Sequence, residues 1–147
     1  MKKKKNKIDG SFAIIEHNLA YSEAFKSLSI YSKWLYMEFK LRFHGDNAKH
    51  IIFKQEEIKK IMAIGTFYKS RNQLIERGII DVINRGGLEK QPAIYGLSDR
   101  WKKYRTKDFI KLDIKDILPK IYNTSFKEGH KFMGNRFKKK NIYSGQI

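Results

Sequence analysis

The side chains best suited to chemistry lie on one predicted helix, which begins near Thr66 and ends before Gly78. At 100° per residue, Lys69, Asn72 and Gln73 fall on the face opposite its apolar residues. Asparagine and glutamine amides can each pair with two atoms of adenine, and a lysine ammonium can bind guanine or a phosphate. This face is therefore a candidate surface for contacting a nucleic acid, although any helix at a protein surface has a polar face.

Three further residues of this helix border the polar face. Thr66 and Tyr68 flank it, and Arg71 lies at the margin of the apolar face. A long basic side chain can bury its stem while its charge stays outside. We therefore expect the Arg71 guanidinium to reach outward, toward a phosphate if DNA is bound, and count all three as candidate binding residues.

The charge of the chain also favours a polyanionic partner. There are 32 Lys and Arg against 15 Asp and Glu, which gives a net charge of +17. Basic domains of this kind most often bind nucleic acid. The excess lies in three clusters around a nearly neutral middle, at residues 2–7, 100–111 and 126–147. We interpret residues 1–10 as a flexible basic arm and 126–147 as a flexible basic tail, and add to the candidate binding residues Arg100, Lys102, Lys103 and Arg105.

Other chemistry finds little support in the sequence. The chain has no cysteine, which excludes disulfides, thiolate zinc sites and a cysteine nucleophile. We interpret His44, Asp46 and His50 as exposed loop residues, because neither helical spacing nor a cysteine supports metal coordination by them. The pair Gly86-Gly87 has no following Lys-Ser/Thr and is not a phosphate-binding loop. We therefore predict no catalytic residue, metal or cofactor, and a protein that is not an enzyme.

Length and hydropathy narrow the class of protein further. A chain of 147 residues suits one domain with a real core. No stretch approaches the roughly 18–20 apolar residues that a membrane span needs, and the basic start leads into no apolar signal core. We expect a cytoplasmic protein that has no membrane partner.

The elements that would position these residues follow from hydrophobic periodicity and from capping and turn residues. In chain order we predict a strand over residues 11–16, a short helix capped by Ser22, a long helix capped by Ser29, a strand over 51–53, a helix over 55–62, the helix from Thr66, strands over 79–84 and 93–97, and a short basic helix capped by Ser98. The last two strands, joined by a glycine-rich loop, indicate a hairpin. Gly78 is the expected C-terminal cap of the helix from Thr66.

The helix from Ile30 to Phe43 is apolar on nearly two faces. One stripe contains Ile30, Trp34, Met37 and Leu41, and a second contains Tyr31, Leu35 and Phe39. Such a helix is either central to the core or also meets a partner subunit. The second possibility predicts a homodimer formed through this helix.

This order of elements is the layout of a winged helix-turn-helix, in which one helix fits the major groove of DNA and the hairpin, or wing, reaches phosphates. The chain resembles winged-helix DNA-binding proteins over residues 29–97. Its strongest local match, TFYKSRNQLIERGII from Thr66 to Ile80, is similar to the recognition helix and first wing strand of bacterial and phage transcription or replication regulators. The turn over residues 63–65 is about two residues shorter than that pattern usually has.

The resemblance implies an α+β fold with three parts besides the basic arm. These are a winged-helix domain over residues 11–105, which includes an N-terminal strand, a C-terminal extension over 106–125 packed on that domain, and the basic tail. On the wing, Arg85 and Lys90 become candidate phosphate contacts.

The function that follows is sequence-specific binding of double-stranded DNA, in replication initiation or transcription regulation of a phage or plasmid. The alternative is a module for single-stranded nucleic acid or RNA that stacks bases on aromatic rings such as Tyr68, Trp101 and Tyr104. A third reading makes the domain a protein-interaction scaffold with basic tails.

Overall fold

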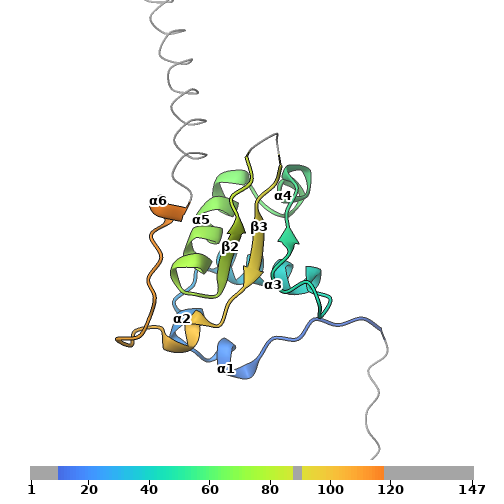
Figure 1. The fold of residues 1–147 in the computed structure, drawn as a ribbon. Coiled ribbons are helices and arrows are strands. Elements are labelled where there is room, and N and C mark those ends of the chain that lie inside the picture. The colour runs from blue at the N-terminus through green and yellow to red at the C-terminus, as the bar shows by residue number, and fades with distance from the viewer. Residues whose placement is uncertain (1–9, 88–90, 118–147) are drawn as a thin grey trace, which may run out of the picture.

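The computed structural model of the protein describes residues 10–87 and 91–117. The described part is an α+β fold (Figure 1). In chain order its elements are α1 (His17–Ala20), α2 (Glu23–Lys26), α3 (Ile30–Arg42), β1 (Ile51–Ile52), α4 (Gln55–Ile61), α5 (Ile64–Glu76), β2 (Ile80–Asn84), β3 (Ile94–Leu97), the 3-10 helix η2 (Arg100–Lys103) and α6 (Ile114–Ile117). The predicted α+β class is therefore confirmed.

The three strands form one small antiparallel sheet in the order β1-β3-β2. Tyr95 of the central strand faces Ile51 on one side and Val82 on the other. The predicted hairpin is confirmed, and its pairing shifts register between Val82 and Asn84. Because β3 has a neighbour on each side, its side chains are the best placed to join the sheet to the helices.

Aromatic rings from the helices and the sheet meet in the core. The Phe39 ring of α3 lies 4.7 Å from that of Phe53 and 5.7 Å from that of Tyr95, measured between ring centres. The ring of Phe67, from α5, lies 5.5 Å from that of Phe53. Aromatic pairs at such distances add stability beyond the area they bury. This cluster fixes α5 against α3 and the sheet, and so decides which face of α5 remains at the surface.

Three predicted caps are confirmed. The Ser22 hydroxyl accepts a hydrogen bond from Phe25 N at 3.2 Å, and the Ser29 hydroxyl accepts one from Ser32 N at 3.2 Å. Gly78 follows the last turn of α5 with φ of +76°, a conformation that glycine adopts without strain. A Cβ at this position would lie 2.8 Å from the Arg100 Cβ, so the segment after β3 also needs a glycine here.

Three sequence predictions about elements are wrong. Residues 11–16 are extended but pair with no strand in the described part, and their apolar Phe12 and Ile14 are exposed. The basic helix after Ser98 is only the single 3-10 turn η2. Helix α5 begins at Ile64 rather than Thr66, so that only Met62 and Ala63 separate it from α4.

The chain after η2 returns along the body of the molecule. Leu112, Ile114 and Ile117 pack against the core, and α6 lies beside the upper turns of α5 in Figure 1. The predicted extension continues to residue 125, beyond the described residues. The basic arm, apart from Gly10, the basic tail over 126–147 and Lys90 also lie outside them.

Candidate nucleic-acid interface

One side of α5 is open to solvent along its whole length. Gly65, Lys69 and Glu76 are exposed on it, and Thr66, Tyr68 and Asn72 are half-buried at its margins. Nothing lies within 4 Å of a Cβ built on Gly65, so another molecule can approach the backbone of the first turn closely. This side carries hydroxyl, ammonium and amide groups near the N-terminal end of the helix.

Arg71 does not reach outward as predicted. Its side chain is only 4% exposed, and its Nη1 donates to the Tyr95 hydroxyl at 3.2 Å. Its guanidinium also lies over the Tyr68 ring, 4.8 Å from the ring centre. A buried charge is stable only with hydrogen-bond partners, and here the Tyr95 hydroxyl of β3 is one. The prediction was wrong because it did not take this acceptor into account.

Arg71 also fixes the orientation of the neighbouring Asn72. The Asn72 Oδ1 accepts from Arg71 Nε at 3.2 Å and from Nη2 at 3.0 Å. The amide oxygen is therefore turned toward the guanidinium, and the Asn72 Nδ2 group is the end of the amide that points away from it. An oriented amide of this kind offers N–H donors to an incoming ligand.

Burial keeps the Tyr95 hydroxyl neutral. It raises the pKa of Tyr95 above the ordinary tyrosine value, and the adjacent Arg71 guanidinium lowers that pKa in part. A neutral hydroxyl can accept the hydrogen bond from Arg71. The chain Tyr95–Arg71–Asn72 therefore links the centre of the sheet to the solvent side of α5.

Gln73 does not point away from the body of the molecule as predicted. Its Oε1 accepts from Ser29 N at 2.8 Å and from the Ser32 hydroxyl at 2.6 Å. These contacts tie the last turn of α5 to the first turn of α3. A helical wheel considers α5 alone, so it assigned Gln73 to the solvent face. In the fold, α3 packs against this side of α5, and Gln73 contacts it through hydrogen bonds.

Arg85, which follows the last residue of β2 at the start of the hairpin loop, is exposed, and its Nη2 donates to the Asp116 carbonyl of α6 at 3.2 Å. The next residue, Gly86, has φ of +67°, and a Cβ there would lie 2.6 Å from the backbone on the far side of the loop. The hairpin and α6 are thus joined beside α5. The sequence gives no sign of this contact with Asp116, because the acceptor is a backbone carbonyl, which any residue provides.

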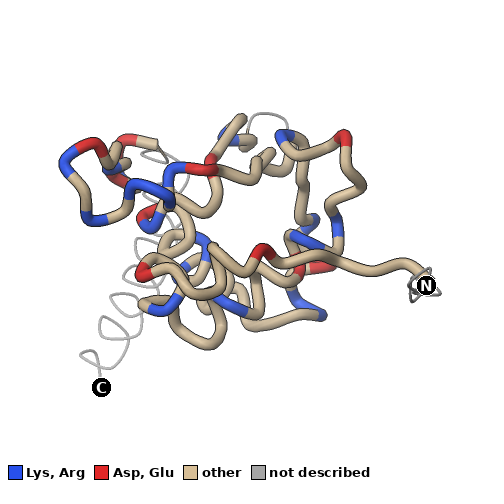
Figure 2. The backbone as a smooth tube through the Cα atoms, turned by 90° about the horizontal axis from the view of Figure 1, so that it is seen from below, with Lys and Arg blue, Asp and Glu red and all other residues tan. Residues whose placement is uncertain are grey.

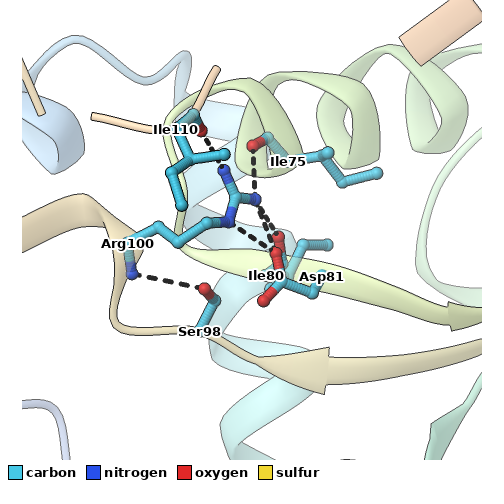
Figure 3. A network of polar contacts seen from close by, with 6 residues as sticks. All are labelled: Ile75, Ile80, Asp81, Ser98, Arg100 and Ile110. Carbon is cyan, nitrogen blue, oxygen red and sulfur yellow. Dashed lines mark hydrogen bonds and ion pairs between the residues drawn. The ribbon is translucent and has the colours of Figure 1, made fainter. Parts of the chain in front are cut away.

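Arg100 is not available to a ligand either, and Figure 3 shows why. Its guanidinium donates to the carbonyls of Ile75 at 3.1 Å, Ile80 at 3.2 Å and Ile110 at 3.0 Å. It also binds the Asp81 carboxylate, with an Nε–Oδ1 distance of 2.8 Å. Arg100 therefore joins the end of α5, the start of β2 and the returning chain.

The other residues of this basic cluster are exposed, but at the far end of α5. The backbone N–H of Trp101 donates to the Gly78 carbonyl, which places η2 just beyond the C-terminus of α5. Arg105 pairs with Glu23 of α2 at 3.5 Å, and Lys102 pairs with Asp99 at 3.3 Å. A helix of 13 residues rises about 20 Å, so the structure divides the predicted site residues between two ends of α5.

The charge of the described part is spread rather than gathered. Residues 10–87 and 91–117 carry 19 Lys and Arg and 12 Asp and Glu, a net charge of +7 out of +17. Seen from below, basic positions are scattered over the chain with acidic ones among them (Figure 2). Most of the net charge therefore belongs to the two terminal segments.

Within the described residues, no group of three His, Cys, Asp or Glu side chains is placed to hold a metal ion. None of the helices there is long and apolar enough to cross a membrane. Comparison with protein-family models, with curated proteins and with solved structures finds no match to this chain.

Proposed function

We propose that this protein binds double-stranded DNA with sequence specificity as a winged helix-turn-helix, with α5 in the major groove. The helix–strand–helix–helix–hairpin order and the strand order β1-β3-β2 are compatible with that fold. In this assignment α4 braces α5 and the β2–β3 hairpin is the wing. Regulation of replication or transcription of a phage or plasmid is the process that the resemblance of residues 66–80 favours.

The observation that carries the proposal is the oriented amide on the open side of α5. Asn72 lies between the exposed Lys69 and the exposed Glu76 on this side, and its oxygen is held by Arg71. With that oxygen engaged, Asn72 presents donors, which suit the acceptors of guanine, thymine or the N7 of adenine in the major groove. The two-atom pairing with adenine that the sequence suggested would also need the amide oxygen, which Arg71 already occupies. Asn72 would therefore bind through its N–H donors alone.

The hairpin and the terminal segments would supply affinity rather than specificity. Arg85 stands at the start of the hairpin loop, and the segments outside the described residues carry +10 of the net charge. Contacts to phosphates position a protein on DNA without reading bases. If roughly six phosphates are neutralised, affinity should fall about a thousandfold between 50 and 200 mM salt.

The test is selection from a randomised duplex library with the full chain, the Asn72→Ala variant and the control Lys103→Ala, at two salt concentrations. We expect one motif for the native chain and the control, and loss of preference at one base pair for Asn72→Ala. An absence of any selected motif, or affinity that does not change with salt, would contradict the proposal.

The single-strand alternative is less well supported by the ring positions. Trp101 is buried, and the Tyr104 ring contacts Phe109 and lies under Arg77 and Arg105. Stacking needs an open ring face. Competition of the selected duplex by its separated strands distinguishes the two readings, since a single-strand binder is displaced by either strand.

A further inference from the structure

Helix α3 exposes one of its two apolar stripes. Leu35, Tyr36 and Phe39 are buried in the core, whereas the stripe formed by Ile30, Trp34, Met37 and Leu41 faces solvent, with exposed fractions of 77%, 51%, 38% and 59%. Tyr31, beside this stripe, is exposed as well. Of the ten exposed large apolar residues in the described part, five lie on this one helix. A contiguous apolar patch of this kind marks an interaction surface, whereas single exposed apolar residues are ordinary.

The spacing of the exposed stripe is that of a coiled coil. Its residues follow one another at intervals of four, three and four, which is the alternation of d and a positions in a heptad. On a helical wheel they span only about 60°, a narrow seam rather than the broad face that packs on a protein core. A narrow heptad seam fits the matching seam of another helix.

We propose that this stripe pairs with the same stripe of a second copy of the chain, with the two α3 helices parallel. The proposal goes beyond DNA binding and does not depend on it. Self-pairing is favoured because one helix supplies both halves of a complementary seam, as a two-fold interface requires.

The charges beside the stripe select the parallel arrangement. Lys33 and Lys40 occupy the g positions on one side, and Glu38 occupies an e position on the other. In a parallel pair, each g residue faces the e residue five positions later in the other helix. Lys33 then meets Glu38 of the second copy, and the symmetry repeats this ion pair.

An antiparallel pair would be opposed by charge. There g positions face g positions, so Lys33 of each copy would meet Lys40 of the other. Glu38 is already held by Arg42 of its own helix, at 2.9 Å through one carboxylate oxygen. The Glu38 side chain is 16% exposed, and Arg42 also lies over the ring of the buried Phe53, 4.1 Å from its centre. The parallel arrangement therefore needs Glu38 to turn from Arg42 toward Lys33 of the second copy.

The area available sets the expected strength. A stable interface buries about 800 Å² on each partner, and a stripe on a single helix of 13 residues offers less. We therefore expect a dissociation constant on the order of 10 μM, measured in about 0.3 M salt so that the repulsion between two basic chains is screened.

The first experiment is sedimentation equilibrium of the full chain, without DNA, over roughly 1–200 μM. We expect a monomer–dimer equilibrium that Leu41→Lys weakens at least tenfold. The control Ile110→Lys changes an equally exposed apolar residue away from α3 and should leave the dissociation constant unchanged. Circular dichroism checks that both variants stay folded.

A chain that remains monomeric throughout, including one whose own terminal segments cover the stripe, overturns the proposal. So does a dimer that Leu41→Lys does not weaken. Because this experiment contains no nucleic acid, its failure leaves the DNA-binding proposal untouched.

The second experiment tests the direction of the helices. In the parallel pair, Lys33→Glu and Glu38→Lys should each weaken self-association several-fold, and an equimolar mixture of the two variants should restore it through a heterodimer. In an antiparallel pair, Lys33→Glu would instead face Lys40 and tighten the dimer, which would overturn the parallel arrangement.

Discussion

Basic residues lie near both ends of α5, and their surroundings differ. Near the N-terminal end, Gly65 and Lys69 stand in solvent. Beyond the C-terminal end, the Arg100 guanidinium is enclosed by three backbone carbonyls and the Asp81 carboxylate (Figure 3). A helix ends in carbonyls that lack partners and begins with N–H groups that lack them.

This difference has a physical cause in the helix itself. Its C-terminal carbonyls attract cations and its N-terminal N–H groups attract anions. A basic side chain beyond the C-terminus is therefore drawn into the protein, as Arg100 is by Ile75. The opposite end has no side-chain cap on its N–H groups in the described structure, which suits an external anion. Net charge alone does not distinguish a binding arginine from a structural one.

The comparison is tested most strongly at Arg100. Arg100→Ala should lower the free energy of unfolding by about 3 kcal/mol, because it leaves several carbonyls and a partly buried carboxylate without their donor. Arg100→Lys should recover only part of this loss, since an ammonium cannot span the same partners. Urea denaturation measures both. The matched control is Lys103→Ala, for which we expect a change within about 0.5 kcal/mol. Similar losses of stability at both positions would contradict the distinction between an enclosed Arg100 and an exposed Lys103.

Asn72 and Gln73 sharpen the comparison within one turn of α5. Gln73→Ala should lower the free energy of unfolding by about 1–2 kcal/mol, because Ser29 N and the Ser32 hydroxyl lose their shared acceptor. Asn72→Ala should also lower the free energy of unfolding, by about 1 kcal/mol, because Arg71 Nε and Nη2 lose their acceptor. Unlike Gln73→Ala, it should in addition lose about 1–3 kcal/mol of discrimination at one base pair.

Library selection on both variants separates these roles, and urea denaturation measures the stability that each variant loses. The assignment of roles is wrong if Gln73→Ala changes the selected motif while Asn72→Ala does not.

Local signals in the sequence were sufficient to predict the elements that depend on them. Ser22, Ser29 and Gly78 act through hydrogen bonds and backbone angles within a few residues, and each cap is confirmed. The strand predicted over residues 11–16 is wrong because a strand also needs a partner, which periodicity does not report.

The candidate site was only partly predictable for the same reason. The solvent positions of Lys69 and Asn72 follow from helical periodicity. Arg71 pairs with Tyr95, Gln73 with Ser29 and Arg100 with Asp81, each at least 19 residues away in the chain, and no local pattern identifies these partners. A charged residue at an apolar helical position was nevertheless a usable sign, since Arg71 stands where burial required a polar partner.

Two buried tyrosines extend the comparison to alkaline pH. Burial raises the pKa of Tyr36, and the nearby Glu16 and Asp99 raise it further, whereas Arg71 partly offsets the rise in the pKa of Tyr95. A raised pKa means that stability is fully present below the unfolded value of about 10 and is lost as pH rises above it.

We expect Tyr36 to account for a loss on the order of 1 kcal/mol in the free energy of unfolding between pH 9 and pH 11. Tyr36→Phe should remove that loss and Tyr95→Phe should remove less, as measured by urea denaturation at both pH values. If the free energy of unfolding falls equally with pH in the native chain and in Tyr36→Phe, the pKa of Tyr36 is not raised in the folded state.

The smallest expected effect compares one lysine at each end of α5. If Lys69 contacts a phosphate, Lys69→Ala should lower affinity for all sequences about equally, by roughly fourfold in 0.2 M salt, and should reduce the salt slope by about one. Lys103→Ala removes the same charge from the other end, so it should change neither quantity beyond the small effect of net charge. The measurement is a titration of the selected duplex, and of an unrelated one, at several salt concentrations. An equal loss of affinity for both variants would mean that binding depends only on the total charge of the protein. Neither end of α5 would then be a specific contact site for DNA.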